Sequence, residues 1–311
     1  MANETGAAMS WGGWWIALVV FAAVAQTARN AAQRSLTAEL GTWAATLVRF
    51  LYGLPLAGLA LVLLYTVPST PPQITHWSWA YFGWIALGAF FQIAATGALL
   101  LAMQQRNFAV AVTLSKTEVL QVALFGAVFL HELPTAWALG AMAIATVGVA
   151  LLSMPPRQPG ARFEWRSKAA LYGLICGACF AIATVGFRGA ALELQAPTAL
   201  LSGAWGVFTA QCMQTLAMGL WFVWRDPGVL VRIAKAWRVS LVAGCMGSAA
   251  SLAWFSAYAL QSAASVRTLG MVEVIFSYIV SRRFLKEQLR LNEKWGIALV
   301  LIGIVIICTQ L

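Results

Sequence analysis

The chain has 311 residues, of which 61% are hydrophobic and 10% are charged, and its mean hydropathy is +0.79. Water-soluble domains are about half apolar and about one quarter charged, so this composition excludes a soluble globular protein. The formal net charge of +10 does not indicate a nucleic-acid partner, because the basic residues lie at the ends of apolar runs, where they anchor helices at a membrane surface.

Long apolar runs separated by short breaks fill the chain. A helix needs about 20 apolar residues to cross a hydrocarbon core of about 30 Å, and each run has about that length. Proline, glycine and charged residues occupy the breaks and predict helix ends and turns. We therefore predict an all-α integral membrane protein with ten transmembrane helices, at about 14–33, 42–65, 79–103, 107–130, 134–153, 168–190, 196–224, 238–260, 264–286 and 291–310.

The two halves of the chain resemble each other. Residues 94–148 align with residues 249–303 without a gap, and the matches include Glu118 with Glu273. Five helices in each half is an odd number, so the second half must enter the membrane from the opposite side. Inverted repeats of this kind are a recurring transporter design, with the substrate site where the halves meet.

We expect a first five-helix repeat at residues 1–153, a second at 168–311 and a connecting loop at 154–167. The basic residues of the loops lie mostly on one predicted side of the membrane, whereas the other side has Arg188 and Arg267 near helix ends. The positive-inside rule then places the basic side in the cytoplasm of a bacterial-type inner membrane and both termini outside.

Glu118 and Glu273 fall deep within the predicted fourth and ninth helices. An ionisable residue at membrane depth is costly and by default marks a functional site. On a continuous helix, Ser115 and Gln121 share a face with Glu118, so these residues are expected to line a cavity. A carboxylate there can meet a substrate ammonium or exchange a proton, which makes proton coupling a further expectation. The alternative is that each glutamate pairs with a buried cation or bonds a neighbouring backbone.

Lys116 is expected to point away from Glu118. Two residues on a helix are separated by about 200° of rotation, so their side chains do not meet. We expect Lys116 to contact Glu273, another helix or a substrate carboxylate.

Three arginines lie within or near predicted helices. Arg29 and Arg188 occupy equivalent positions in the two halves, and their guanidinium groups suit a carboxylate or a phosphate. Snorkelling toward the interface is the alternative, and it is the interpretation favoured for Arg49.

Gln92, Trp254 and Tyr258 are further candidate substrate-binding residues, and none of them carries a charge. Gln92 is a midspan polar residue that either binds a ligand or joins two helices, and the two aromatic residues lie deep enough to form a cavity wall or to pack in the core. The sequence has no hydrolase, metalloprotease, P-loop or dinucleotide-binding motif, so no enzyme activity is expected. No cofactor or metal is expected either, since the CxxC of Cys176 and Cys179 lies inside a predicted helix.

Each half contains a Phe-Leu-x-Glu turn followed by a glycine-containing helix. The turns are Phe129-Leu130-His131-Glu132 and Phe284-Leu285-Lys286-Glu287, and the glycines are Gly148 and Gly303. These features resemble the EamA-like drug/metabolite transporter superfamily over nearly the entire chain.

The resemblance implies ten helices around a central cavity. Helices 1, 3, 4, 6, 8 and 9 would line that cavity, helices 5 and 10 would lie outside it, and Glu132 and Glu287 would be structural. The sequence departs from the many members that have proline at the positions of Val119 and Val274, and from those with the opposite charge bias.

We therefore expect a secondary transporter that exports amino acids or related small polar metabolites by alternating access, as a monomer or a homodimer in the lipid bilayer. One alternative is a transporter of an anionic metabolite, such as a phosphorylated sugar or an organic acid, held by Arg29, Arg188 and Lys116. Another is a membrane-embedded lipid-handling enzyme.

Overall fold

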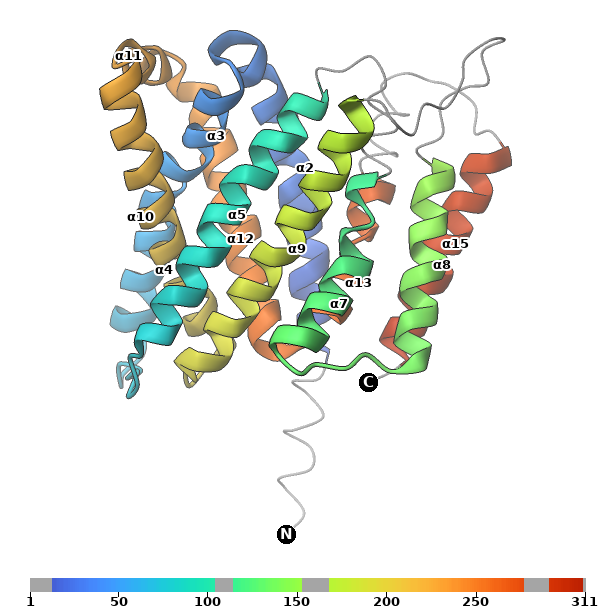
Figure 1. The fold of residues 1–311 in the computed structure, drawn as a ribbon. Coiled ribbons are helices and arrows are strands. Elements are labelled where there is room, and N and C mark those ends of the chain that lie inside the picture. Colours follow the sequence, from blue (N-terminus) through green and yellow to red (C-terminus); the bar gives the residue numbers. More distant parts are fainter. Residues whose placement is uncertain (1–12, 104–113, 153–167, 277–290, 310–311) are drawn as a thin grey trace, which may run out of the picture.

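The computed structural model describes residues 13–103, 114–152, 168–276 and 291–309, and the regular structure within these ranges is helical (Figure 1). The helices are α2 (Trp14–Leu40), α3 (Thr42–Leu51), α4 (Leu54–Thr66), α5 (Trp79–Met103), α7 (Glu118–Phe129), α8 (Ala136–Leu152), α9 (Lys168–Leu194), α10 (Ala199–Arg225), α11 (Gly228–Lys235), α12 (Trp237–Leu260), α13 (Ala263–Leu269) and α15 (Leu291–Cys308).

Six helical segments of the described chain are long and apolar enough to cross a membrane. They are α2, the α3–α4 pair, α5, most of α9, α12 and α15, while α7 and α8 are shorter apolar helices. The prediction of an all-α membrane protein is confirmed. The predicted helices 107–130 and 264–286 lie partly outside the described residues.

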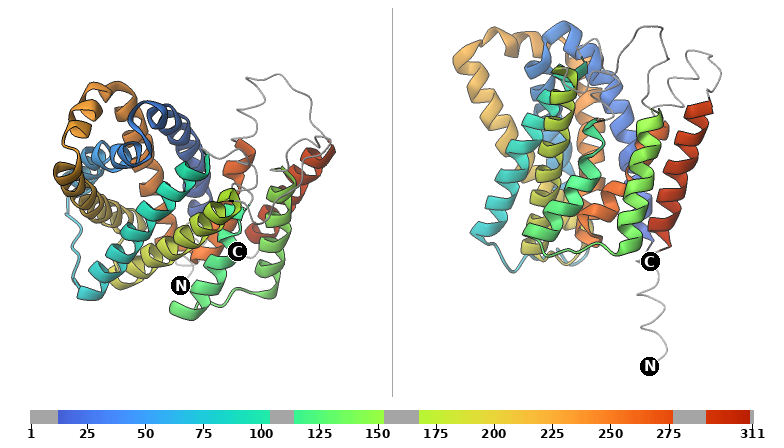
Figure 2. Two further views of the ribbon diagram at one scale, coloured as in Figure 1. Left: turned by 45° about the horizontal axis from the view of Figure 1, so that its top comes forward. Right: turned by 45° about the vertical axis from the view of Figure 1, so that its right-hand side comes forward.

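The longest helices pack in pairs that join distant parts of the chain. α5 packs against α9, α2 against α12, and α8 against α15. Figure 1 shows α5 and α9 side by side with opposite chain directions, and Figure 2 shows α8 and α15 together at one edge of the bundle. The core therefore lies between the two halves of the sequence.

The second predicted helix, 42–65, is interrupted and forms α3 and α4. Pro55 has no backbone N–H for the carbonyl of Leu51, and its ring crowds that carbonyl, so the helix cannot continue through this position. A Cβ on Gly53 would lie 2.8 Å from the carbonyl oxygen of Arg49 and 3.1 Å from that of Gly244. Glycine thus allows the interruption to pack closely against α12.

The predicted fourth and ninth helices are also broken, and each break lies just before a glutamate. Lys116 and Thr117 form a turn, so Glu118 is the first residue of α7 and not the middle of a continuous helix. Both the backbone N–H and the hydroxyl of Thr117 bond the carbonyl oxygen of Leu114, at 3.2 and 2.6 Å. The side chain competes with the helical hydrogen-bond pattern, which explains the break.

In the second half, the chain leaves α13 at Gly270 and turns through Met271 before Glu273. Gly270 favours an interruption because it has the lowest helix propensity after proline. The N–H of Met271 bonds the carbonyl of Thr268 at 3.1 Å, a tighter pattern than that of an α-helix. Each half of the chain thus has a break in its helix beside a carboxylate.

Candidate functional site

A cavity of about 430 Å³ lies where the two broken helices meet the centre of the bundle. Side chains from α2, α3, α5, α7, α9, α12, α13 and both breaks surround it, and within the described residues α8 and α15 contribute none. This lining agrees with the cavity implied by the family resemblance, with Arg49 of α3 as an addition. Its charged members are Arg29, Arg34, Arg49, Lys116, Glu118, Arg267 and Glu273.

The structure brings most of the predicted site residues to this cavity. Those that line it are Gln92, Ser115, Lys116, Glu118, Trp254, Tyr258 and Glu273. Gln121 does not: its side-chain amide turns back along α7 and donates to the hydroxyl of Thr117 at 3.0 Å. The expectation that Gln121 faces a cavity beside Glu118 was therefore wrong.

Glu273 is held by several donors from the first half of the chain. Its Oε2 accepts a hydrogen bond of 2.5 Å from the amide of Gln26, and its Oε1 accepts one of 3.0 Å from the amide of Asn30. The Nζ of Lys116 lies 3.8 Å from Oε2. The carboxylate is thus compensated by two amides and the Lys116 ammonium, and Arg29 and Arg267 also attract it without an ion pair, which agrees with the need of a buried charge for partners.

Glu118 pairs with a cation from the second half. The Nη2 of Arg267 lies 2.5 Å from the Oε1 of Glu118, and both side chains are largely buried. The two ion pairs are reciprocal, because Lys116 and Glu118 flank the first break whereas Arg267 and Glu273 flank the second. Lys116 meets Glu273, one of the three partners that the sequence left open for it, and a turn rather than a continuous helix separates Lys116 from Glu118.

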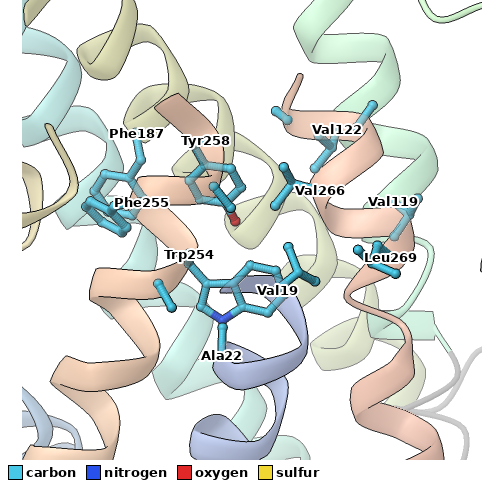
Figure 3. Close-up of a cluster of buried hydrophobic side chains, with 14 of the residues drawn as sticks. Val19, Ala22, Val119, Val122, Phe187, Trp254, Phe255, Tyr258, Val266 and Leu269 are labelled. Carbon is cyan, nitrogen blue, oxygen red and sulfur yellow. The ribbon is translucent and has the colours of Figure 1, made fainter. Parts of the chain in front are cut away.

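Aromatic rings form one wall of the cavity. Trp254 and Tyr258 stack with ring centroids 6.3 Å apart, and Phe255 packs on Phe187 of α9 at 4.1 Å (Figure 3). The indole N–H of Trp254 donates to the Oε1 of Gln26 at 3.1 Å, and the Arg267 guanidinium lies 5.0 Å from the Trp254 ring centroid. This wall therefore contacts polar groups from both halves of the chain.

Two arginines enter the cavity away from these pairs. Arg29 and Arg49 are each only 4% exposed. The Nη2 of Arg29 donates to the Oδ1 of Asn30 at 2.7 Å, and the Nη1 of Arg49 donates to the hydroxyl of Thr96 at 3.2 Å. Snorkelling was the wrong interpretation for Arg49, because the side chain turns inward and is covered by protein.

Arg188 has a different role from its sequence equivalent, Arg29. Its Nε donates to the Oε1 of Glu132 at 2.8 Å, and its Nη1 bonds the carbonyl oxygen of Tyr258. Arg188 does not line the cavity. The pair ties α9 to the turn after α7, which agrees with the structural role implied for Glu132. Glu287 lies outside the described residues.

Three important residues of the site were missed or misplaced by the sequence analysis. Arg267 was placed near a helix end, but it reaches the centre of the bundle. Gln26 and Asn30 lie one helical turn apart on α2 and both bond Glu273. Their spacing within an apolar run was the available signal, since polar residues at i and i+4 share a helix face.

A cavity lined by buried charged side chains, between broken helices of a multi-pass bundle, is an arrangement found in solute carriers. The class of the protein is therefore a helical membrane transporter. Residues 13–154 match the family model of the EamA-like transporter family, and residues 232–310 match the model described as Magnesium transporter NIPA. The resemblance to the EamA-like drug/metabolite transporter superfamily is thereby confirmed.

No curated protein matches the sequence. Among solved structures, one described as "Crystal structure of protein" is similar, with a TM-score of 0.69 and 14% sequence identity. The match covers 96% of this chain and 97% of the other. This similarity concerns the fold alone.

Proposed function

We propose that this protein is a secondary transporter that moves a small polar metabolite through the cavity by alternating access. The observation that carries the proposal is the reciprocal pairing of Lys116 with Glu273 and of Arg267 with Glu118 across two broken helices. Each pair joins one half of the chain to the other beside the cavity. A change in either pair therefore alters the contact between the halves and the space for a solute together.

The proposed architecture is ten membrane crossings in two inverted five-helix repeats, at residues 1–153 and 168–311. Reciprocal helix contacts support it. α2 of the first half packs against α12 of the second, and α5 of the first packs against α9 of the second. If α9 is equivalent to α2, and α12 to α5, these two contacts are images of each other, as a pseudo-twofold axis requires.

Amino acids are the substrate class suggested by the sequence, with Glu118 or Glu273 meeting the substrate ammonium. The geometry favours a second class, anionic metabolites. Both carboxylates already have cationic partners, whereas the arginines in the cavity outnumber them. An amino acid would have to displace a cation that belongs to the protein, and an organic anion would not.

Magnesium, the ion in the description of the second matching family model, suits this cavity less well. Mg²⁺ prefers carboxylate, carbonyl and water oxygens. The described residues contain no cluster of three or more aspartate, glutamate, histidine or cysteine side chains that could hold a metal. The charged lining is also predominantly basic, which repels a divalent cation.

We further propose export across a bacterial-type inner membrane, with both termini outside and with the basic loops in the cytoplasm. The charge bias of the loops supports the orientation. A monomer or a homodimer is compatible with this proposal, and proton coupling through Glu118 or Glu273 is part of it.

Flux into proteoliposomes tests the proposal. Purified protein is reconstituted, and uptake of a panel of amino acids and organic acids is measured with and without a pH gradient. Saturable uptake of one class that is lost on Glu118→Gln and Glu273→Gln supports the proposal. Equal flux in these variants and the wild type would remove the site role of the glutamates, and formation of a lipid product without solute flux would favour a membrane-embedded enzyme.

A further inference from the structure

Arg29 and Arg49 approach each other over one glycine of α12. A Cβ on Gly247 would lie 3.2 Å from the Cδ of Arg29 and 3.2 Å from the Cγ of Arg49. The two aliphatic stems therefore cross the same bare stretch of helix, one from α2 and one from α3. Any larger residue at this position would push both arginines away from α12.

The two guanidinium groups have only partial anionic compensation, since Glu273 attracts Arg29 without forming an ion pair with it, and Arg29 repels Arg49. A guanidinium offers five N–H donors, and the hydrogen bonds of these residues within the described chain go to the neutral oxygens of Asn30 and Thr96. The ion pairs of the described residues involve neither arginine. Two buried cations that line one cavity without a hydrogen-bonded carboxylate are costly, and an anion bound between them would offset part of that cost.

We propose that Arg29 and Arg49 form an oxyanion subsite, which binds the carboxylate or phosphate group of a small organic anion that has no ammonium group. The inference rests on the proposed transport function and specifies its substrate class. Paired guanidinium groups suit an oxyanion because each can donate two parallel hydrogen bonds.

The remainder of the cavity explains why the anion would lack an ammonium group. Glu273 already accepts hydrogen bonds from Gln26 and Asn30, with the Lys116 ammonium 3.8 Å away. Glu118 is engaged by Arg267 at 2.5 Å. A substrate ammonium would find no free carboxylate here, and it would also be repelled by the arginines.

Binding by a matched series of four-carbon solutes tests the charge requirement. Succinate has two carboxylates, 4-aminobutanoate has an ammonium-bearing methylene group in place of one of them, and putrescine has two ammonium groups. Inorganic phosphate serves as a minimal oxyanion. The thermal unfolding midpoint of the full chain in detergent is followed against each probe at constant ionic strength. We expect saturable stabilisation by succinate or phosphate, at least tenfold weaker binding of 4-aminobutanoate, and none of putrescine.

Variants then locate the site. Arg29→Gln and Arg49→Gln should each raise the half-saturating concentration of the stabilising anion at least tenfold. Gly247→Ala keeps every charge but displaces both stems, and it should weaken binding severalfold. Arg232→Gln is the matched control, because this exposed arginine pairs with Asp226 outside the cavity, and it should leave binding unchanged.

Three results would overturn the subsite: failure of both anions to stabilise the wild type, equal or tighter binding of 4-aminobutanoate or putrescine, or unchanged anion binding in folded Arg29→Gln and Arg49→Gln variants. Flux measured in proteoliposomes distinguishes failure of the subsite proposal from failure of the transport proposal. Anion binding without flux of any solute would refute transport and keep the subsite, whereas flux that is insensitive to both arginines would refute the subsite alone.

Discussion

The Nη2 of Arg267 lies 2.5 Å from the Oε1 of Glu118, although these residues belong to different halves of the chain and to different broken helices. Arg267 lies in the last turn of the short helix α13, and Glu118 begins α7. A buried ion pair compensates the desolvation of its members only while both are present. The pair therefore links the position of one helix break to that of the other.

Removal of one partner should destabilise the protein strongly. We expect Glu118→Gln to lower the free energy of unfolding by about 3–5 kcal/mol, because it leaves the Arg267 charge buried without its carboxylate. Denaturant titration of the purified variant in mixed micelles measures this loss. The side chain of Gln has nearly the same shape as that of Glu, so the effect reports charge rather than packing.

The double variant Glu118→Gln/Arg267→Gln is the control for that result. Replacement of both charges leaves no uncompensated ion, so it should recover at least half of the stability lost in the single variant. The loss of stability in the double variant could instead equal the sum of the losses in Glu118→Gln and Arg267→Gln. That result would contradict a coupled pair.

The ion pair of Lys116 with Glu273 should contribute less to the free energy of unfolding than the pair of Arg267 with Glu118. Lys116 lies 3.8 Å from Glu273 and its side chain is 21% exposed, whereas the carboxylate keeps the amides of Gln26 and Asn30. We expect Lys116→Gln to cost about 1 kcal/mol or less, in the range of partly exposed pairs. The same unfolding titration compares it with Arg267→Gln, and equal losses for the two variants would argue against this ranking.

Composition and hydrophobic run length were sufficient to predict the helical membrane class, because a chain this apolar has few other stable states. They did not predict where the helices break. A long apolar run looks the same whether or not it contains a turn, and the turn at Lys116 depends on the Thr117 hydroxyl bonding the Leu114 carbonyl. Pro55 was the clearest available signal of an interruption, and it lies between α3 and most of α4.

Membrane depth and the alignment of the two halves together selected Glu118 and Glu273, since a carboxylate in lipid demands an explanation. Their partners were harder to predict. Arg267 is far from Glu118 in sequence, and Arg49 was interpreted as an interfacial residue because its inward direction depends on the packing of α3 against α12. Side-chain direction at these positions is a tertiary property, so periodicity within one helix could not reveal it.

The contact between α8 and α15 should be important for stability but not for the site. A Cβ on Gly148 would lie 2.8 Å from the carbonyl oxygen of Gly296, so Gly148→Leu must separate the helices. We expect a loss of about 1–3 kcal/mol in the free energy of unfolding. The solute concentration that gives half-maximal flux should stay unchanged, since the cavity lining includes no described residue of these helices.

Gly140→Leu on the same helix is the matched control for Gly148→Leu. A Cβ at Gly140 has no atom of the described chain within 4 Å, so this variant should unfold like the wild type. Equal destabilisation by both substitutions would show that the effect comes from helix composition rather than from the α8–α15 contact.

The close approach of α9 to the first helix break should be required for transport. A Cβ on Gly177 would lie 3.0 Å from the carbonyl oxygen of Ser115 and 3.4 Å from the backbone nitrogen of Glu118. Gly177→Val would push the backbone at Ser115 and Glu118 away from α9. The Glu118 carboxylate would then be displaced from Arg267. Overpacking destabilises a conformation by about 1–3 kcal/mol. If it affects one transport state more than the other, the population of that state falls by about tenfold. Gly126→Val on α7 is the control, because a Cβ on Gly126 would have no atom of the described residues within 4 Å. We expect proteoliposome flux to fall about tenfold in Gly177→Val and to persist in Gly126→Val; similar flux in the two folded variants would mean that transport does not depend on the contact between the break and α9.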